Sequence, residues 1–382
     1  MAAILVVALS GGSGQSEHSP TSLAPTGPPA APGPPAAPAP LTLRFGASVN
    51  TLFNLPDYSA AQIDAQLAAL KQTGVTLARS DALWEAAEPT PPSGGVHHYS
   101  WSFDDRIVGS LASSGLQWLP ILDYSPAWAQ SVPGQEHSPP RSAADFAAFA
   151  AALAARYGPS GAFWREHPEL TPQPTDTYEV WNEPDVGFFW LPRPYPAGLA
   201  DLYAASRDAI RAVDPSARVI VGGLAHPDTT LPAMLTARPR LRGHIDGIAI
   251  HPYAPRPVRV LALIRSYRSV MNRLGLSEVP LYVTELGWST SPPQDPKYAP
   301  PQLRPGYIAR TFAALGHSSC GLAAVVLYSW MTPERNPALV DDWFGIHPPS
   351  GGSSADTRAF TSALRDAKQP RTELAPPAAG CV

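Results

Sequence analysis

Residues 177–184 read TYEVWNEP, a mostly apolar and aromatic run that ends in a carboxylate and a proline. Residues 281–288 repeat the pattern as LYVTELGW, with Glu285 near the end of the run. Buried strands of parallel sheets consist of such short apolar runs, and glycine or proline commonly ends them. We therefore expect Glu183 and Glu285 to lie at the carboxyl ends of two buried strands.

The same alternation of strand and helix patterns extends over most of the chain. Strand-like runs are expected at 43–49, 76–80, 117–122, 177–182, 218–222, 247–251, 281–285 and 323–329. Helical spacing of apolar residues is expected at 60–72, 103–113, 143–156, 198–213, 231–241, 258–274, 305–315 and 355–364. Eight strands, each followed by a helix, predict a closed parallel (β/α)8 TIM barrel with a single catalytic domain. A doubly wound open sheet is the alternative, but no glycine-rich phosphate loop follows the first strand.

The two ends of the chain differ in composition from the barrel. We expect 1–18 to be a signal-like or disordered N-terminus, because its apolar start is too short for a membrane helix. Nine prolines fall within the 21 positions from Pro20 to Pro40, so 19–40 is interpreted as an extended linker. The catalytic domain is assigned to 41–368 and a C-terminal tail to 369–382. A tether behind a signal-like start predicts a secreted or cell-surface tethered protein on the bacterial exterior.

Composition restricts the class of partner. The chain has 382 residues, 44% of them hydrophobic and 15% charged, with a formal charge of −4. A large core is thus expected, and a nucleic-acid partner is not, because no cluster of Lys and Arg offers phosphate contacts. We expect a monomer without a transmembrane span.

The chain has two cysteines, Cys320 and Cys381, and no CxxC pair. This spacing argues against zinc ribbons and thioredoxin chemistry. The two thiols either pair or remain free. Because Cys320 precedes the eighth strand and the last helix also ends at the bottom of the barrel, we predict a disulfide between them.

Active sites of such barrels lie at the carboxyl ends of the strands. The residues expected there are polar, aromatic or acidic: Asn50, Arg79, Asp123, Tyr124, Asn182, Glu183, His251, Tyr253, Glu285, Trp288 and Trp330. The strand interiors are Val, Ile, Leu and Ala. This change in polarity predicts a site at the barrel mouth.

A pair of carboxyl groups at the mouth suits the cleavage of glycosidic bonds. Retaining enzymes place the two groups about 5–5.5 Å apart, and inverting enzymes place them farther apart. Aromatic neighbours favour Glu183 as the acid, while Arg79 and Tyr253 could keep Glu285 ionised as the nucleophile. Asn182 could donate a hydrogen bond to the sugar hydroxyl beside the anomeric carbon.

Tryptophans support a carbohydrate site, because indole faces suit the C–H face of a sugar ring. Eight of ten are expected at or beyond the strand ends: Trp84, Trp101, Trp128, Trp181, Trp190, Trp288, Trp330 and Trp343. Large aromatics that simply pack the loops over the barrel are the alternative. We include Trp128, Trp288 and Trp330 among the expected substrate-binding residues, together with Asp123 and Tyr124.

The motifs WNEP at 181–184 and TELGW at 284–288 together resemble clan A of the glycoside hydrolases. The resemblance implies a retaining (β/α)8 enzyme and covers roughly residues 43–364. It implies roles for Asn182 and Glu183 as the acid/base motif, Glu285 as nucleophile, Arg79 as its support, His251 and Tyr253 as the strand-six pattern, and Trp330 as the tryptophan beneath the cleaved sugar. Family 39 and its bacterial exopolysaccharide-cleaving relatives are the most similar, with family 5 as an alternative. Asp185 and Asp123 depart from common patterns of the clan.

The prediction is an O-glycosyl hydrolase that cleaves β-linked oligo- or polysaccharides with retention. It requires no cofactor, and His226, His244 and His251 lack the spacing of metal ligands. A transglycosylase on the same site and a non-catalytic carbohydrate-binding barrel are the alternatives. An acyl hydrolase is disfavoured because no Gly-x-Ser-x-Gly motif is present.

Overall fold

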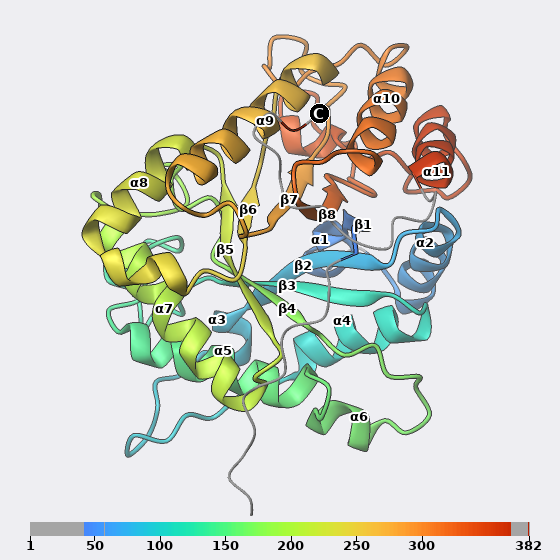
Figure 1. The fold of residues 1–382 in the computed structure, drawn as a ribbon. Helices are drawn as coiled ribbons and strands as arrows, with labels where there is room; N and C mark the ends of the chain where they lie inside the picture. Colours follow the sequence, from blue (N-terminus) through green and yellow to red (C-terminus); the bar gives the residue numbers. More distant parts are fainter. Residues whose placement is uncertain (1–41, 57, 368–380, 382) are drawn as a thin grey trace, which may run out of the picture. The chain divides into compact units, whose positions relative to one another are not determined.

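A computed structural model describes residues 42–56, 58–367 and 381, and eight parallel strands close into a barrel (Figure 1). The strands are β1 (Arg44–Ser48), β2 (Leu77–Leu83), β3 (Gln117–Asp123), β4 (Thr177–Val180), β5 (Arg218–Leu224), β6 (Ile248–Ile250), β7 (Leu281–Leu286) and β8 (Leu322–Leu327). Each strand pairs with its neighbours in sequence, and β8 pairs with β1 to close the ring. The expected (β/α)8 TIM barrel is confirmed, and an open doubly wound sheet is excluded.

Helices form the outer layer of the barrel (Figure 1). The expected helical stretches correspond to α2 (Ala60–Gln72), α4 (Ser102–Ser113), α5 (Ala143–Tyr157), α7 (Pro196–Val213), α8 (Pro227–Ala237), α9 (Pro257–Arg273), α10 (Arg304–Gly316) and α11 (Ala355–Ala367). Short helices α1 (Asn50–Asn54), α3 (Trp84–Ala87) and α6 (Ala162–Glu166) and the 3-10 turns η1 (Pro239–Gly243) and η2 (Val340–Trp343) add to them. Side-chain hydrogen bonds define the N-termini of two helices. A capping box between Ser59 and Gln62 begins α2, and the Ser142 hydroxyl accepts from the Asp145 amide at the start of α5.

The core has two parts, one on each face of the barrel wall. Every residue of β7 and β8 is buried, as expected for strands covered on both faces. Leu77, Ile220, Ala249 and Tyr282 belong to a small cluster contributed by several different strands, as expected for the barrel interior, separate from the larger apolar core. Successive side chains of a strand alternate between faces, so Arg79 points to the same interior as Leu77.

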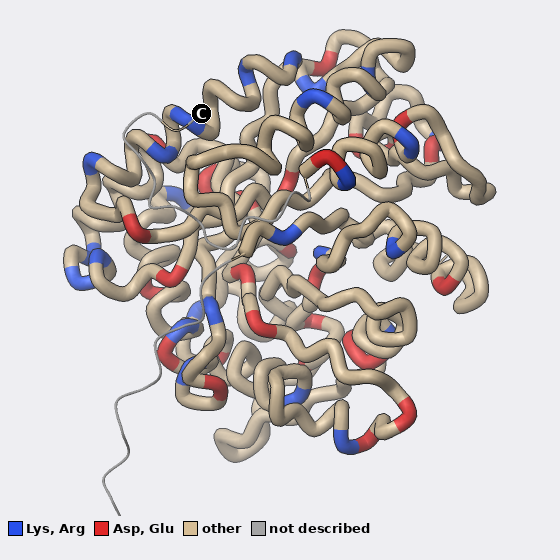
Figure 2. The backbone as a smooth tube through the Cα atoms, turned by 45° about the vertical axis from the view of Figure 1, so that its right-hand side comes forward, with Lys and Arg blue, Asp and Glu red and all other residues tan. Residues whose placement is uncertain are grey.

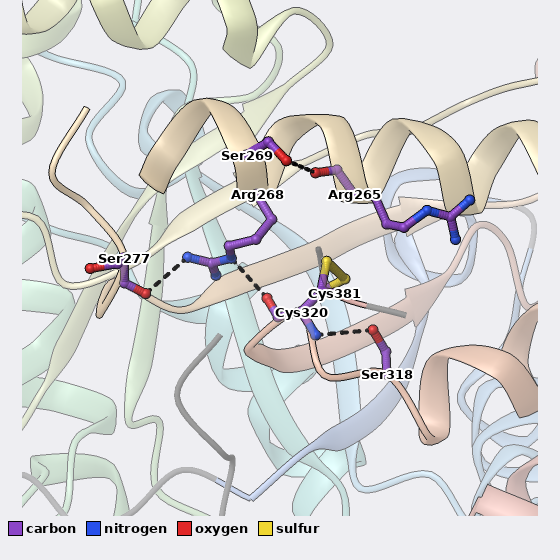
Figure 3. Close-up of a disulfide and its surroundings, with 7 residues drawn as sticks. All are labelled: Arg265, Arg268, Ser269, Ser277, Ser318, Cys320 and Cys381. Carbon is purple, nitrogen blue, oxygen red and sulfur yellow. Dashed lines mark hydrogen bonds between the residues drawn. A yellow bond between two sulfur atoms is a disulfide. The ribbon is translucent and has the colours of Figure 1, made fainter. Parts of the chain in front are cut away.

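The predicted disulfide between Cys320 and Cys381 is confirmed, and Figure 3 shows it beside α9. Arg268 of α9 is buried and donates through Nε to the carbonyl of Cys320 at 2.9 Å. The same guanidinium donates through Nη1 to the carbonyls of Leu276, Ser277 and Val279, which lead into β7. Because Cys320 precedes β8, this bond lies at the end of the barrel opposite the carboxyl ends of the strands.

Charged residues of both signs are interspersed along the tube in Figure 2. None of the described helices is both long enough and apolar enough to cross a membrane. The expected N-terminus at 1–18 and linker at 19–40 lie outside the described residues. Of the expected tail at 369–382, only Cys381 is described.

Candidate active site

Glu183 and Glu285 meet at the mouth of the barrel on either side of His251. The Nδ1 atom of His251 lies 2.7 Å from Glu183 Oε1 and 3.6 Å from Glu285 Oε2. Ligand-type atoms of the three side chains all lie within 4.8 Å of one another. The side chains of Glu183 and Glu285 are 14% and 11% exposed, so both are largely withdrawn from water yet still accessible. The two strand-end carboxylates of the sequence are thus neighbours in space.

Arg79 lies inside the barrel below the two glutamates and hydrogen bonds to the side chains at the bottom of the site. Its Nη1 donates to Glu285 Oε1 at 2.7 Å, and its Nη2 donates to Asn182 Oδ1 at 3.1 Å. Nε and Nη2 also form a two-pronged pair with Glu179 at 2.7 and 3.1 Å. Burial would lower the pKa of the guanidinium, but the charges of Glu179 and Glu285 outweigh it and raise the pKa well above the usual value. Arg79 therefore stays charged.

Glu179 is a member of this network that the sequence reasoning missed. It is fully buried, and its Oε1 also accepts hydrogen bonds from the Gly223 amide at 2.8 Å and the Thr284 hydroxyl at 3.0 Å. A carboxylate inside an otherwise apolar strand of a parallel barrel must have partners, because an unpaired buried charge is strongly unfavourable. That signal is present in the quoted TYEV run and could have found it.

Glu285 is held as a carboxylate by two hydrogen-bond donors and by the nearby charge of His251. Tyr253 donates its hydroxyl to Glu285 Oε2 at 2.7 Å, opposite the Arg79 contact on Oε1. Burial would raise the pKa of Glu285, but His251, Arg79 and Tyr253 together lower it below its usual value. Glu285 is therefore ionised near neutral pH.

His251 connects the two glutamates. Its Nε2 lies 3.2 Å from the Thr284 hydroxyl, while Nδ1 faces Glu183. Burial would lower the pKa of His251, but the negative charges of Glu285 and Glu183 raise it above the usual value. Nδ1 and Glu183 Oε1 therefore form a hydrogen bond that ties the ring to the carboxyl group. Gly223 makes room for this ring, since a Cβ there would lie 2.0 Å from His251 Nε2.

The backbone after β4 aims Glu183 into the mouth. The expected strand 177–182 ends at Val180, because Trp181 and Glu183 have φ angles of 69° and 42°. Such left-handed conformations are unfavourable for these residue types and need support from their surroundings. The Trp181 amide donates to the Leu122 carbonyl at 3.0 Å, and the Glu183 amide donates to the Gly223 carbonyl at 3.1 Å. The strands on either side of β4 thereby fix the turn.

Asp123 is the last residue of β3, and Tyr124 follows it directly. Asp123 is fully buried, and neither of its carboxylate oxygens has a hydrogen-bond partner among the described residues. Burial and the nearby charge of Asp81 raise the pKa of Asp123 well above its usual value, which favours the neutral acid. Tyr124 is partly buried, and its ring packs edge-on against Trp181 with ring centres 5.3 Å apart.

Of the three tryptophans expected to bind substrate, Trp288 and Trp330 are buried and Trp128 is partly buried. Trp330 is fully buried, donates its indole N–H to Gln66 of α2 at 2.9 Å and stacks on His347. Trp288 is also buried and donates to the Ala254 carbonyl. Trp128 is partly buried and donates to the Glu88 carbonyl. Trp288 and Trp330 are thus withdrawn from solvent, and their role in substrate binding stays a prediction.

The same holds for the wider set of tryptophans. Trp84, Trp181 and Trp190 are buried as well, so loop packing accounts for most of the rings expected at the rim. Tyr328, just after β8, lies nearer the pair: its ring centre is 6.3 Å from that of Tyr253. Burial, with smaller contributions from the charges of Asp341 and Glu285, raises the pKa of Tyr328 well above its usual value. Sequence reasoning passed over Tyr328 in favour of Trp330, two residues later.

Glu183, His251 and Glu285 could in principle offer three atoms to a metal ion. The donor set is a poor match, because Arg79 already neutralises Glu285 from 2.7 Å and Tyr253 occupies its other oxygen. A divalent cation would have to compete with that guanidinium. The histidines His226 and His244 do not join the cluster.

Comparisons with known proteins support the fold. No protein-family model matches the chain, and no curated protein is significantly similar in sequence. Among solved structures, a family 39 β-xylosidase from Caulobacter crescentus has a TM-score of 0.64 at 21% identity, covering 86% of this chain and 73% of that one. An exo-β-1,4-mannosidase from an Opitutaceae bacterium scores 0.59 at 17% identity, covering 86% and 60%. A family 5 protein from Bifidobacterium longum subsp. infantis scores 0.59 at 15%, covering 87% and 80%. The similarity to these family 39 and family 5 structures is one of fold and covers most of this chain.

Proposed function

We propose that this protein is a retaining O-glycosyl hydrolase that cleaves β-linked glycosides by double displacement, with Glu285 as nucleophile and Glu183 as acid/base. One observation carries the proposal: carboxyl oxygens of Glu183 and Glu285 approach within 4.8 Å, across His251. This spacing suits direct attack by one carboxylate, whereas an inverting enzyme needs about 6.5–9.5 Å to accommodate a water. The solved structures of similar fold include enzymes described as a xylosidase, a mannosidase and a glucosidase, which agrees with this proposal.

In the first step Glu285 attacks the anomeric carbon, and the bond from that carbon to the leaving oxygen breaks. Glu183 gives a proton to this oxygen, so the leaving group departs as a neutral alcohol. Tyr253 and Arg79 donate hydrogen bonds that keep Glu285 ionised before attack. They remain close to its oxygens while the ester bond to the sugar forms. His251 Nδ1 lies within hydrogen-bond distance of Glu183 Oε1, at 2.7 Å, and orients this carboxyl group toward the leaving oxygen.

In the second step Glu183, now a carboxylate, removes a proton from a water molecule. The resulting hydroxide attacks the anomeric carbon from the face that the leaving group left, and Glu285 is released. Two inversions give overall retention. Asn182, fixed by Arg79, is placed to hydrogen bond the sugar hydroxyl beside the anomeric carbon.

We infer that the natural substrate is an oligo- or polysaccharide and that the enzyme works outside the cell as a monomer. The disulfide between Cys320 and Cys381 supports export, because such bonds persist mainly in oxidising compartments. The intact pair of glutamates, with a charged Arg79 behind it, favours an enzyme over a non-catalytic binding barrel.

The test uses Glu285→Ala and Glu183→Ala with a panel of 2,4-dinitrophenyl β-D-xylosides, glucosides, mannosides and galactosides. Glu285→Ala should lose roughly 10⁴-fold or more in kcat, and azide should restore turnover to give the α-glycosyl azide. Glu183→Ala should instead give the β-glycosyl azide, because azide then attacks the covalent intermediate. Glu278→Ala, an exposed glutamate preceding β7, is the matched control. Wild-type rates in Glu285→Ala, or an inverted product from the wild-type enzyme, would reject the proposal.

A further inference from the structure

Four aromatic rings beside Glu183 have no part in the mechanism described above. They are Tyr124 and His137, in the loop after β3, and Phe188 and Phe189, in the loop after β4. We name this set the aromatic step. The ring centre of His137 lies 4.4 Å from that of Tyr124, 4.6 Å from Phe188 and 5.3 Å from Phe189. Phe188 and Phe189 are 5.0 Å apart, so the rings form one continuous surface.

The aromatic step begins at the catalytic pair and ends in water. The ring of Tyr124 packs edge-on against Trp181, two residues before Glu183, with ring centres 5.3 Å apart. At the other end Phe188 is 65% exposed, the highest exposed fraction among the exposed large hydrophobic side chains of the described residues. The step therefore runs outward from the acid/base side of the mouth, away from Glu285 on β7.

The loop that carries the two phenylalanines is held firmly by its own contacts. Arg193 donates to the carbonyls of Pro184 and Asp185, and its guanidinium lies 4.3 Å above the ring of Tyr195. Trp190 is buried, and the indole of Trp181 donates to the Phe189 carbonyl at 2.7 Å. Phe188 is not a lone exposed side chain, because His137 and Phe189 lie half-buried against it. A contiguous apolar patch of this kind beside a site is typical of a binding surface.

We propose that the aromatic step is the subsite for the leaving group, and that it selects a leaving group built on a ring with an apolar face, either a second sugar ring or an aryl ring. This rests on the proposed function, because an acid that protonates the bridging oxygen lies on the side where the departing part of the substrate sits. Phenylalanine faces offer stacking and no hydrogen bond, so they recognise the flat apolar side of a ring.

His137 adds a polar side chain to the aromatic step. It is half-buried, and neither ring nitrogen has a hydrogen-bond partner within the part of the chain that the structure describes. A ring stacked on Phe188 or Phe189 would bring its substituents to this imidazole, which can donate to or accept from a hydroxyl. A small alkyl leaving group such as methyl would reach neither the phenylalanines nor His137.

The test compares three substrates that share the glycone identified by the panel above and differ in leaving group: methyl, phenyl and a second pyranose. Phe188→Ala should lower the ratio of kcat/KM for the ring leaving groups to that for methyl by about three- to tenfold. Phe188→Tyr should keep the wild-type ratio. A loss on the disaccharide alone identifies a sugar as the natural leaving group, and a loss on phenyl alone identifies an aryl group.

Val213→Ala is the matched control, because Val213 is an exposed apolar residue at the far end of α7. Val213→Ala should leave the ratios of kcat/KM among the three substrates at their wild-type values. An unchanged ratio in Phe188→Ala overturns the leaving-group subsite while leaving the hydrolase intact. Absence of turnover by the wild-type enzyme on every glycone would reject the proposed function itself, a result of a different kind.

Discussion

At the scale of single residues, the Tyr253 hydroxyl controls the charge of Glu285. It donates at 2.7 Å to a carboxylate whose pKa burial would otherwise raise. Tyr253→Phe removes one of the two hydrogen-bond donors that lower this pKa, so the pKa of Glu285 should rise. Activity needs the carboxylate and is lost as pH falls through its pKa, so the acid limb of kcat/KM should move to higher pH. The optimum rate should fall by roughly 10- to 100-fold, as expected for losing a hydrogen bond to a charged group.

The control for this change is Tyr282→Phe. Tyr282 is another fully buried tyrosine of the barrel, but its hydroxyl has no hydrogen-bond partner among the described residues. Its removal should leave the pH profile of kcat/KM where it is. A uniform loss of rate in Tyr253→Phe, with an unmoved acid limb, would show that the hydroxyl does not act through the charge of Glu285.

The sequence predicted the meeting of Glu183 and Glu285 because both end apolar runs, and barrel topology brings strand ends together. It also placed Arg79 and Tyr253 beside Glu285, where they lie. It did not predict the packing of Trp288 and Trp330, because residue order does not say which side of the barrel wall a ring occupies after the strand has ended. Glu179 was missed although a charge inside an apolar strand is a visible signal.

At the scale of elements, Asp185 ties the loop of Glu183 to the start of α8. Its carboxylate accepts from the amides of Ala225 at 3.1 Å and His226 at 2.6 Å, and from the Thr230 hydroxyl at 3.1 Å. Asp185→Ala leaves these donors without their partner, so the free energy of unfolding should fall by about 1–3 kcal/mol. The turn with Glu183 at φ 42° loses one of its supports. The loss of kcat/KM should therefore be larger for leaving groups that need protonation than for dinitrophenolate.

Asp201→Ala provides the comparison for Asp185. Asp201 joins α7 to Arg238 beyond the end of α8 through a half-exposed ion pair, far from the Glu183 turn in sequence. Exposed ion pairs of this kind contribute about 0–1 kcal/mol, so little should change. Equal losses of kcat/KM for both classes of leaving group in Asp185→Ala would mean that the residue supports the fold alone.

Elements were predicted best where their pattern is long. All eight strands and the helices of ten or more residues follow from periodicity in the sequence. Helices α1, α3 and α6 did not, because four or five residues are too few to display a helical period. The end of β4 was predicted two residues too late. The residue types at 181–183 do not indicate the left-handed backbone that Trp181 and Glu183 adopt.

At the scale of the whole molecule, the Cys320–Cys381 bond closes a loop with a sequence separation of 61 residues that contains all of β8 and α11. A cross-link of this length restricts the unfolded chain, and the entropic estimate for it is about 4 kcal/mol. The double variant Cys320→Ser/Cys381→Ser should therefore unfold at a lower denaturant concentration, with a free energy of unfolding lower by up to that amount. The Arg268 contact should survive, because it is made to the backbone carbonyl of Cys320.

The same variant should keep the wild-type kcat/KM under folding conditions, because Cys320 precedes β8 while Glu285 lies at the carboxyl end of β7. Wild-type protein unfolded in the presence of a thiol reductant should match the double variant, which separates loss of the bond from the effect of the serines. If the variant and the wild-type protein unfold at the same denaturant concentration without reductant, the bond does not stabilise the barrel. If kcat/KM falls together with stability, the two ends of the barrel are coupled more tightly than this arrangement predicts.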